Sequence, residues 1–251
     1  MMSMAKRFVL LGTLSAGGIV FAACDDSGVP EVGDIACDNL DETNCAFPFP
    51  SDYFRKPGGP NGQATHIDFG TSLPLNDLSG VRISPEPFKI ADGFPTFPSI
   101  SFSLPDATLT DAPGLDTISR SVGNSAFTVV IDAETGEKVP HWVEFDWTAE
   151  EKGVKVIQVK LAKVLKHSRR YIVAVRGLKD AAGKIVPGTR GFLALRDKKQ
   201  IRLKGIEDRR SHFENDIFPQ LEKAGIRRDS LQLAWDFTTV SEKNATGTLL
   251  A

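Results

Sequence analysis

The sequence predicts a mainly β fold with one helix packed near the C-terminus, and three observations lead to this prediction. Between residues 97 and 176, short runs of β-branched and aromatic residues are separated by turn residues such as Asp and Gly. Several of these runs alternate apolar and polar side chains with a period of two. A single stretch, 208–224, instead carries apolar residues every four positions, as a helix does.

The composition is that of a globular protein and argues against nucleic-acid binding. The 251 residues include 30 basic and 32 acidic side chains, and 41% are hydrophobic. Disordered chains have fewer apolar residues and a larger net charge, whereas this length suits one large or two small domains. Proteins that bind nucleic acids usually carry a strong basic excess, so we expect no nucleic-acid partner.

The N-terminus has the pattern of a secretory signal peptide. Lys6 and Arg7 precede sixteen uncharged residues, 8–23. This stretch is shorter than the roughly 20 apolar residues that span a membrane, and a positive start with a short apolar run is typical of a signal peptide. We therefore predict that residues 1–23 are removed, which leaves 28 basic side chains against 32 acidic ones.

The boundary of this segment, Phe21-Ala22-Ala23-Cys24, resembles the lipobox of bacterial lipoproteins. The resemblance implies that a diacylglyceryl group is attached to the thiol of Cys24 and that the chain is cleaved before it and acylated at the new amine. Several acyl chains anchor a protein stably, whereas one binds only marginally. The implied location is the cell envelope, on the periplasmic or cell-surface side of a bacterial membrane. The alternative is an ordinary signal peptide followed by a cysteine by chance.

The other two cysteines, Cys37 and Cys45, are predicted to form a disulfide. An exported protein meets an oxidising compartment, where paired cysteines are normally oxidised. Two cysteines with no histidine nearby do not fill the four positions of a zinc site, and the Cys-x-x-Cys spacing of redox enzymes is absent. We expect no metal and no cofactor.

The N-terminal half of the mature chain is predicted to be mostly irregular. Residues 24–44 are polar and acidic, as in a tether. Aromatic rings and prolines alternate over 45–54, which predicts an extended segment that presses its rings onto a domain surface. Residues 55–85 are rich in Gly, Pro, Asn and Ser and predict a long loop. A short edge strand is predicted at 99–104, because proline is tolerated at strand edges.

Stronger strand patterns follow. The runs 126–131 and 139–147 flank the turn residues 132–136, which predicts a β-hairpin. Two further strands are predicted at 154–161 and 170–176.

The C-terminal part combines helix and strand. A helical turn is predicted at 192–195, and the helix 208–224 has Gly225 in position to cap its C-terminus. A last strand is predicted at 231–237, and Ser241 is placed to cap a new helix.

The stretch Val164–Thr189 resembles the closing hairpin of bacterial Ig-like domains. The residues that match are Leu165, Tyr171, Val173, Val175, Leu178, Asp180 and Gly183. The resemblance implies an Ig-like β-sandwich, so the predicted fold class is mainly β, an Ig-like β-sandwich with a C-terminal helix packed on it.

Three more motifs occur in a set order: Pro-Phe-Pro-Ser-Asp at 48–52, Asp-Gly-Phe-Pro at 92–95, and Phe-Thr-Thr-Val-Ser at 237–241. Together with the lipobox and the Ig-like hairpin, they resemble the N-terminal region of exported bacterial lipase-like lipoproteins of the virulence-factor lipase type. Pro95 stands where that family usually has Ser. In the family, an α/β-hydrolase domain that carries the nucleophile comes next.

These patterns divide the chain into four parts. We predict a lipoprotein signal peptide at 1–23, an acidic tether at 24–44 and an Ig-like β-sandwich domain at 45–200. Residues 201–251 are expected to form a helix-strand extension that leads into a further domain, because the last predicted helix is apolar and incomplete.

No catalytic residue is predicted. The Gly-x-Ser-x-Gly string of a hydrolase nucleophile is absent, and the four histidines, His66, His141, His167 and His212, have no spacing that argues for a metal site or a catalytic triad. His141 shares a strand face with valines, which predicts a hydrogen-bonded core imidazole. His212 lies among charged residues, which predicts a solvated helix face.

The C-terminal third is locally basic. The residues concerned are Arg202, Lys204, Arg209, Arg210, Arg227 and Arg228. One interpretation is an ordinary solvated surface, and the other is contact with anionic lipid or an acidic partner domain.

Three functions are compatible with these patterns. The first is a lipid-anchored, non-catalytic anchoring, spacing or interaction module of a hydrolase-like lipoprotein. Its partners are the membrane, through the acyl chains on Cys24, and a hydrolase domain or another envelope protein. The alternatives are an esterase or lipase-like hydrolase in its own right and a surface module that binds a ligand.

Overall fold

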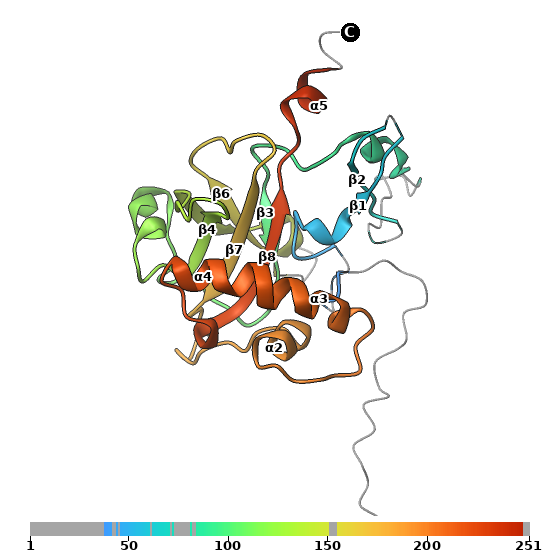
Figure 1. The fold of residues 1–251 in the computed structure, drawn as a ribbon. Coiled ribbons are helices and arrows are strands. Elements are labelled where there is room, and N and C mark those ends of the chain that lie inside the picture. The colour runs from blue at the N-terminus through green and yellow to red at the C-terminus, as the bar shows by residue number, and fades with distance from the viewer. Residues whose placement is uncertain are drawn as a thin grey trace, which may run out of the picture. The chain divides into compact units, whose positions relative to one another are not determined.

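Three antiparallel sheets and a few helices make up the computed structural model, which confirms the mainly β prediction (Figure 1). The structure describes residues 38–41, 44, 46–60, 62–70, 72, 81, 84–150 and 155–247. All of them belong to one structural unit, residues 33–251. Its buried apolar residues, from Leu40 to Phe237, form one continuous core, so this unit has a core of its own.

Two of the sheets have three strands each. The first has the order β3-β6-β5, with β3 at Ile100–Phe102, β6 at Ile157–Leu161 and β5 at His141–Phe145. The second has the order β4-β7-β8, with β4 at Thr128–Asp132, β7 at Arg170–Arg176 and β8 at Leu231–Thr238. These strands confirm the predicted ones to within a few residues, and β3 is an edge strand as expected. Residue 154, at the start of the predicted strand 154–161, lies outside the described residues.

The two sheets contact each other through side chains, and helices cover the other side of the second sheet. The ring of Phe102 on β3 lies 6.0 Å from that of Trp235 on β8. The helix α2 (Arg190–Arg196) and the helical turn η4 pack against β8 (Figure 1). The central strand β7 is therefore covered on both faces, and all its residues from Tyr171 to Val175 are buried. This agrees with the nearly continuous apolar run in its sequence.

The predicted helix at 208–224 is confirmed as a continuous helical segment. It consists of α3 (Ile206–His212), η4 (Phe213–Ile217) and α4 (Phe218–Lys223). The middle part, η4, is a π-helical turn in which the N–H of Phe218 donates to the carbonyl of Phe213. A single residue, Phe218, separates it from Pro219, which has no N–H with which to continue the α-helical ladder. The segment ends before Gly225, which has a positive φ of 79° as the predicted cap requires.

The predicted hairpin between 126–131 and 139–147 is wrong. The two strands, β4 and β5, belong to different sheets, and among the described residues the backbone pairing between their ends is limited to the isolated bridge between Ile131 and Lys138. Pro140 has no N–H to extend the pairing, and the N–H of His141 donates instead to Ser121 Oγ at 3.0 Å. The connection is therefore a corner at which the chain passes from one sheet to the other.

The prediction of a long loop at 55–85 is also wrong in part. Strands β1 (Arg55–Pro57) and β2 (Thr65–Ile67) form a two-stranded antiparallel sheet. The rings of Phe54 and Phe69 flank this sheet and lie 5.3 Å apart. Contacts between distant rings, rather than a local strand pattern, stabilise these two strands.

The remaining elements are short. They are η1 (Asp52–Phe54), η2 (Glu86–Ile90), η3 (Leu115–Val122), α1 (Trp147–Glu150), η5 (Arg228–Ser230) and α5 (Glu242–Gly247). Ser241 Oγ accepts the N–H of Asn244 at 3.1 Å, which confirms the predicted cap of α5. Within the described part of the chain, no helix has the length and apolar character needed to cross a membrane.

Candidate functional site

Two sequence motifs that are far apart in the chain are joined at the C-terminal end of β8. Asp52, the last residue of the Pro-Phe-Pro-Ser-Asp motif, binds Thr238 through both carboxylate oxygens. Its Oδ1 accepts the backbone N–H of Thr238 at 2.8 Å, and its Oδ2 accepts the hydroxyl of Thr238 at 2.6 Å. The N-terminal aromatic segment is thereby bound directly to the last strand.

The Asp-Gly-Phe motif at 92–94 lies at the same place. The N–H of Phe94 donates to the carbonyl of Thr238 at 2.9 Å, and the N–H of Val240 donates to the carbonyl of Phe94 at 2.7 Å. Asp92 Oδ1 accepts the N–H of Ser241 at 2.9 Å. This motif therefore pairs with the chain as it leaves β8.

The turn between β6 and β7, part of the Ig-like stretch, completes the arrangement. The N–H of Arg169 donates to Thr239 Oγ1 at 2.9 Å, and the same hydroxyl donates to the carbonyl of Lys166 at 2.6 Å. The ring of Tyr171 stacks on that of Phe237 at 5.9 Å. We call this meeting point the motif junction; it consists of Asp52, Asp92–Phe94, Lys166–Tyr171 and Phe237–Ser241.

The junction fixes the direction in which the chain continues after β8. Thr239, Val240 and Ser241 are each hydrogen-bonded to a segment distant in sequence. Its side chains are those that bind backbone groups, namely carboxylates and hydroxyls. In the sequence, these residues were notable only for their resemblance to a family, and no local pattern indicated that they meet.

Replacing Gly93 by alanine tests how tight the junction is. A Cβ atom at Gly93 would lie 2.6–2.7 Å from backbone atoms of Thr239 and Val240, which leaves no room for it. We expect the free energy of unfolding to fall by about 2 kcal/mol, in the range of other overpacking substitutions. Urea denaturation measures this.

The matched control is Gly114→Ala, since its Cβ would lie 3.7 Å from its nearest neighbour, an ordinary contact. An equal loss of stability in both variants would show that the close approach at Gly93 is not the cause.

A charge network centred on the buried carboxylate of Asp236 lies next to the junction and corrects the prediction for His212. This residue is not on a freely solvated face: its Nε2 lies 2.8 Å from Asp236 Oδ2, and its Nδ1 lies 3.0 Å from Asp216 Oδ2. Asp236 is only 4% exposed and also binds Arg170 at 3.1 Å. The network links the helical segment to strands β7 and β8.

The environment shifts the pKa of His212, of Asp236 and of Asp52 in the adjacent junction. The hydrogen bond to Asp236 raises the pKa of His212 above its usual value, although burial opposes this. Burial alone would raise the pKa of Asp236, but His212 and Arg170 outweigh burial and lower it. Burial, followed by the charge of Asp236, raises the pKa of Asp52 to about 6.

The raised pKa of Asp52 predicts how the effect of replacing this residue on stability depends on pH. The folded state holds the proton of Asp52 more tightly than the unfolded state, so the contribution of this group to stability is lost as the pH rises from about 3.8 to about 6. Asp52→Asn cannot ionise and keeps an oxygen for the N–H of Thr238. Relative to wild type, it is expected to gain up to about 3 kcal/mol between pH 4 and pH 7.

Denaturation at a series of pH values measures this gain. Asp52→Ala, which loses the hydrogen bonds as well, serves as the comparison and is expected to be less stable than Asp52→Asn throughout. A stability difference between Asp52→Asn and wild type that does not change with pH would contradict the assignment.

The other histidines have separate roles. His141 is fully buried, with its ring nitrogens 2.8 Å from Thr128 Oγ1 and 2.8 Å from the carbonyl of Val139, which confirms the predicted core imidazole. Burial lowers its pKa to about 4. His66 and His167 each lie within hydrogen-bond distance of a backbone carbonyl. The described residues contain no group of three or more potential metal ligands.

An open pocket of about 490 Å³ lies beside the C-terminal end of α4. Its lining residues are Arg196, Asp197, Glu222, Gly225, Ile226, Arg227, Arg228 and Asp229. The three guanidinium groups already have carboxylate partners, which are Asp197, Asp229 and Glu214. The pocket therefore offers little unpaired charge to a ligand.

The residues predicted to be modified, Cys24, Cys37 and Cys45, lie outside the described residues, so the lipid anchor and the disulfide stay predictions. The first residues described are buried against the domain. Asp38 accepts the hydroxyl of Ser51 at 2.7 Å and forms an ion pair with Arg209.

No protein-family model matches the chain, and no curated protein is significantly similar to it.

Proposed function

We propose that this chain is a lipid-anchored, exported and non-catalytic module that holds a hydrolase-like partner domain at a set position relative to a bacterial membrane. The anchor is the acylated Cys24, and the partner is attached beyond β8 or bound to this part of the surface. The two three-stranded sheets act as an Ig-like sandwich between them.

The observation that supports this proposal is the direct bonding of the N-terminal segment to the last strand. Asp52 binds Thr238, and the indole N–H of Trp235 donates to the carbonyl of Pro50 at 2.8 Å. The segment that follows the tether and the strand that leads out of the sandwich are thus joined without an intervening flexible loop. A spacer that transmits orientation requires such a connection.

The motif junction gives a second line of support. Motifs that resemble parts of one lipoprotein family are separated by up to 186 positions in the sequence and yet bind one another. A shared structural role explains why they occur together. Their hydroxyls and carboxylates bind backbone groups, as structural side chains do.

The enzyme alternative needs a nucleophile next to a base. In the described part of the chain, the histidines bind carboxylates, backbone carbonyls or the buried Thr128. The geometry therefore favours the module over the hydrolase.

The anchor is tested by replacing Cys24. In cells fed with a labelled fatty acid, wild type is expected to be labelled and to sediment with membranes, while Cys24→Ser remains unlabelled. Cys37→Ser is the matched control and is expected to keep the label. Equal labelling of wild type and Cys24→Ser would contradict the lipid anchor.

The non-catalytic role is tested by assaying the purified chain with short- and long-chain esters. We expect no hydrolysis above the rate of a buffer blank. Hydrolysis that disappears when a single Ser or His is replaced would overturn the proposal in favour of an enzyme.

A further inference from the structure

We infer that the loop between α2 and α3 is a membrane-facing surface that binds the headgroups of anionic lipids. This inference rests on the proposed lipid anchor. We call its four cationic residues the basic loop; they are Lys198, Lys199, Arg202 and Lys204. All four are exposed.

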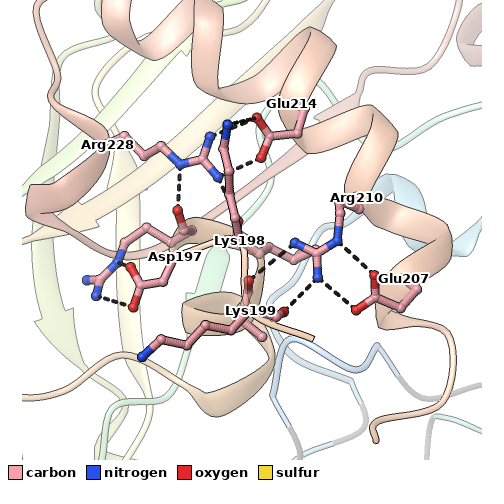
Figure 2. Close-up of polar contacts among 10 residues, drawn as sticks. Asp197, Lys198, Lys199, Glu207, Arg210, Glu214 and Arg228 are labelled. Atoms are coloured by element: carbon pink, nitrogen blue, oxygen red, sulfur yellow. Dashed lines mark hydrogen bonds and ion pairs between the residues drawn. The ribbon is translucent and has the colours of Figure 1, made fainter. Parts of the chain in front are cut away.

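The basic loop differs from the arginines around it, because its charges are largely unpaired. The neighbouring ion pairs are Arg196–Asp197, Arg209–Asp38, Arg210–Glu207, Arg227–Asp229 and Arg228–Glu214. Lys198 lies 3.5 Å from Glu214, which already binds Arg228. Within the described part of the chain, the side chains of Lys199, Arg202 and Lys204 make no hydrogen bond or ion pair. Figure 2 shows the end of Lys199 pointing away from the paired groups.

The backbone of the loop is held in place, so the charges are presented at defined positions. The guanidinium of Arg210 donates to the carbonyl of Lys199 at 2.8 Å, which Figure 2 shows together with its pairing to Glu207. The side-chain amide of Asn39 donates to the carbonyl of Lys204 at 2.7 Å. Between these two points, Ile201 and Leu203 pack against the core.

The basic loop also lies where the chain arrives from the N-terminus. Asn39 binds Lys204 at the C-terminal end of the loop, and its carbonyl lies so close to Gly191 on the neighbouring helix α2 that a Cβ there would be 2.3 Å away. Cys24 precedes Asp38 by fourteen residues, so an anchor at Cys24 keeps this face within about 50 Å of the bilayer. Tethering therefore raises the local concentration of lipid headgroups at the loop.

Charge complementarity indicates which kind of partner binds the basic loop. Clusters of four or more Lys and Arg residues near a membrane attract anionic lipid. The chain as a whole is acidic, with a formal net charge of −2, so an anionic surface attracts this face and repels much of the rest. An acidic protein would offer the same charge, but the arrival of the tether at this face favours the bilayer.

Binding to vesicles tests the inference. The sample is residues 33–251, the unit with its own core, which lacks Cys24 and the acidic start of the tether. Sedimentation is compared for vesicles of phosphatidylcholine alone and of phosphatidylcholine with phosphatidylglycerol. We expect binding only to the latter, with a partition coefficient that falls as salt screens the charges.

A combined variant and a matched control locate the binding. Lys198→Gln, Lys199→Gln, Arg202→Gln and Lys204→Gln together are expected to lower the partition coefficient about tenfold or more. The control replaces four other exposed lysines by Gln, namely Lys163, Lys179, Lys184 and Lys243, and is expected to bind within about twofold of wild type. Cooperative thermal unfolding of each sample confirms that it is folded.

Two results would overturn the inference. In the first, wild type does not bind the anionic vesicles, which is the result expected if the basic loop binds an acidic protein instead. In the second, the control loses as much binding as the basic-loop variant. Because the sample lacks Cys24, its binding is independent of acylation. Failure of the basic loop and failure of the lipid anchor are therefore seen in different experiments.

Discussion

Replacing Trp235 by alanine is expected to lower the free energy of unfolding by about 4 kcal/mol. Trp235 is fully buried in β8, between the two sheets. Its ring contacts Phe102 on the facing sheet, and its indole N–H binds the carbonyl of Pro50. The substitution leaves a cavity between the sheets and removes one of the bonds that hold the N-terminal segment, which is why the expected loss is large.

Two further variants separate these effects. Trp235→Phe keeps most of the ring but leaves the carbonyl of Pro50 without its donor, so a loss of about 1–2 kcal/mol is expected. Trp147→Ala removes a tryptophan that is 74% exposed, and its effect should stay within about 0.5 kcal/mol. Urea denaturation measures the free energy of unfolding of all three variants. A smaller loss in Trp235→Ala than in Trp235→Phe would contradict the packing described.

Replacing Asp236 by alanine is expected to cost about 3 kcal/mol or more at neutral pH. The substitution leaves Arg170 and His212 without their shared carboxylate partner. Both side chains lose charge-assisted hydrogen bonds to a carboxylate that is only 4% exposed, and the missing side chain leaves a cavity at a buried position. His212→Gln is expected to cost less, since its side chain is 40% exposed and water replaces the lost contacts.

The Asp236→Ala substitution also changes how stability depends on pH. In wild type, the raised pKa of His212 means that its contribution to stability is present below about pH 6.5 and is lost as the pH rises through its folded pKa. The lowered pKa of Asp236 means that its contribution is lost as the pH falls below about 3.8. In Asp236→Ala, the pKa of His212 should move down toward its usual value. An NMR titration of His212 that is the same in both proteins would contradict the network.

Elements with a clear local pattern were predictable from the sequence. The helical segment carries Phe213, Ile217 and Leu221 on one side, and all three are buried. The strand β7 has an apolar run that matches its burial on both faces. In these segments, local preference and tertiary packing agree.

Elements that depend on distant contacts were not predictable. Nothing in the sequence around β1 and β2 shows that the rings of Phe54 and Phe69 meet there. The turn 132–136 has the residues of a hairpin turn, but the chain crosses to the other sheet after Pro140. A local pattern defines a turn and two strands without deciding which strands pair.

The site was harder still to predict. His212 has charged neighbours in the sequence, which predicts a solvated face, but its partner Asp236 lies on a strand 24 residues further along. Asp52 and Thr238 are 186 positions apart. Their residue types, a carboxylate and a hydroxyl, are suited to bind backbone groups, yet only the fold brings them together.

Native-state hydrogen exchange tests the central claim most directly, because it reports whether the N-terminal segment and the end of β8 open together or separately. The amides of Phe94, Thr238 and Val240 all donate hydrogen bonds within the motif junction. We predict that they exchange only through global unfolding, with the same free energy of opening as the amides of Val173 and Ala174 in the centre of β7. Exchange of the junction amides that is orders of magnitude faster, while those of β7 remain protected, would show that the junction frays locally and cannot hold a partner in a set orientation.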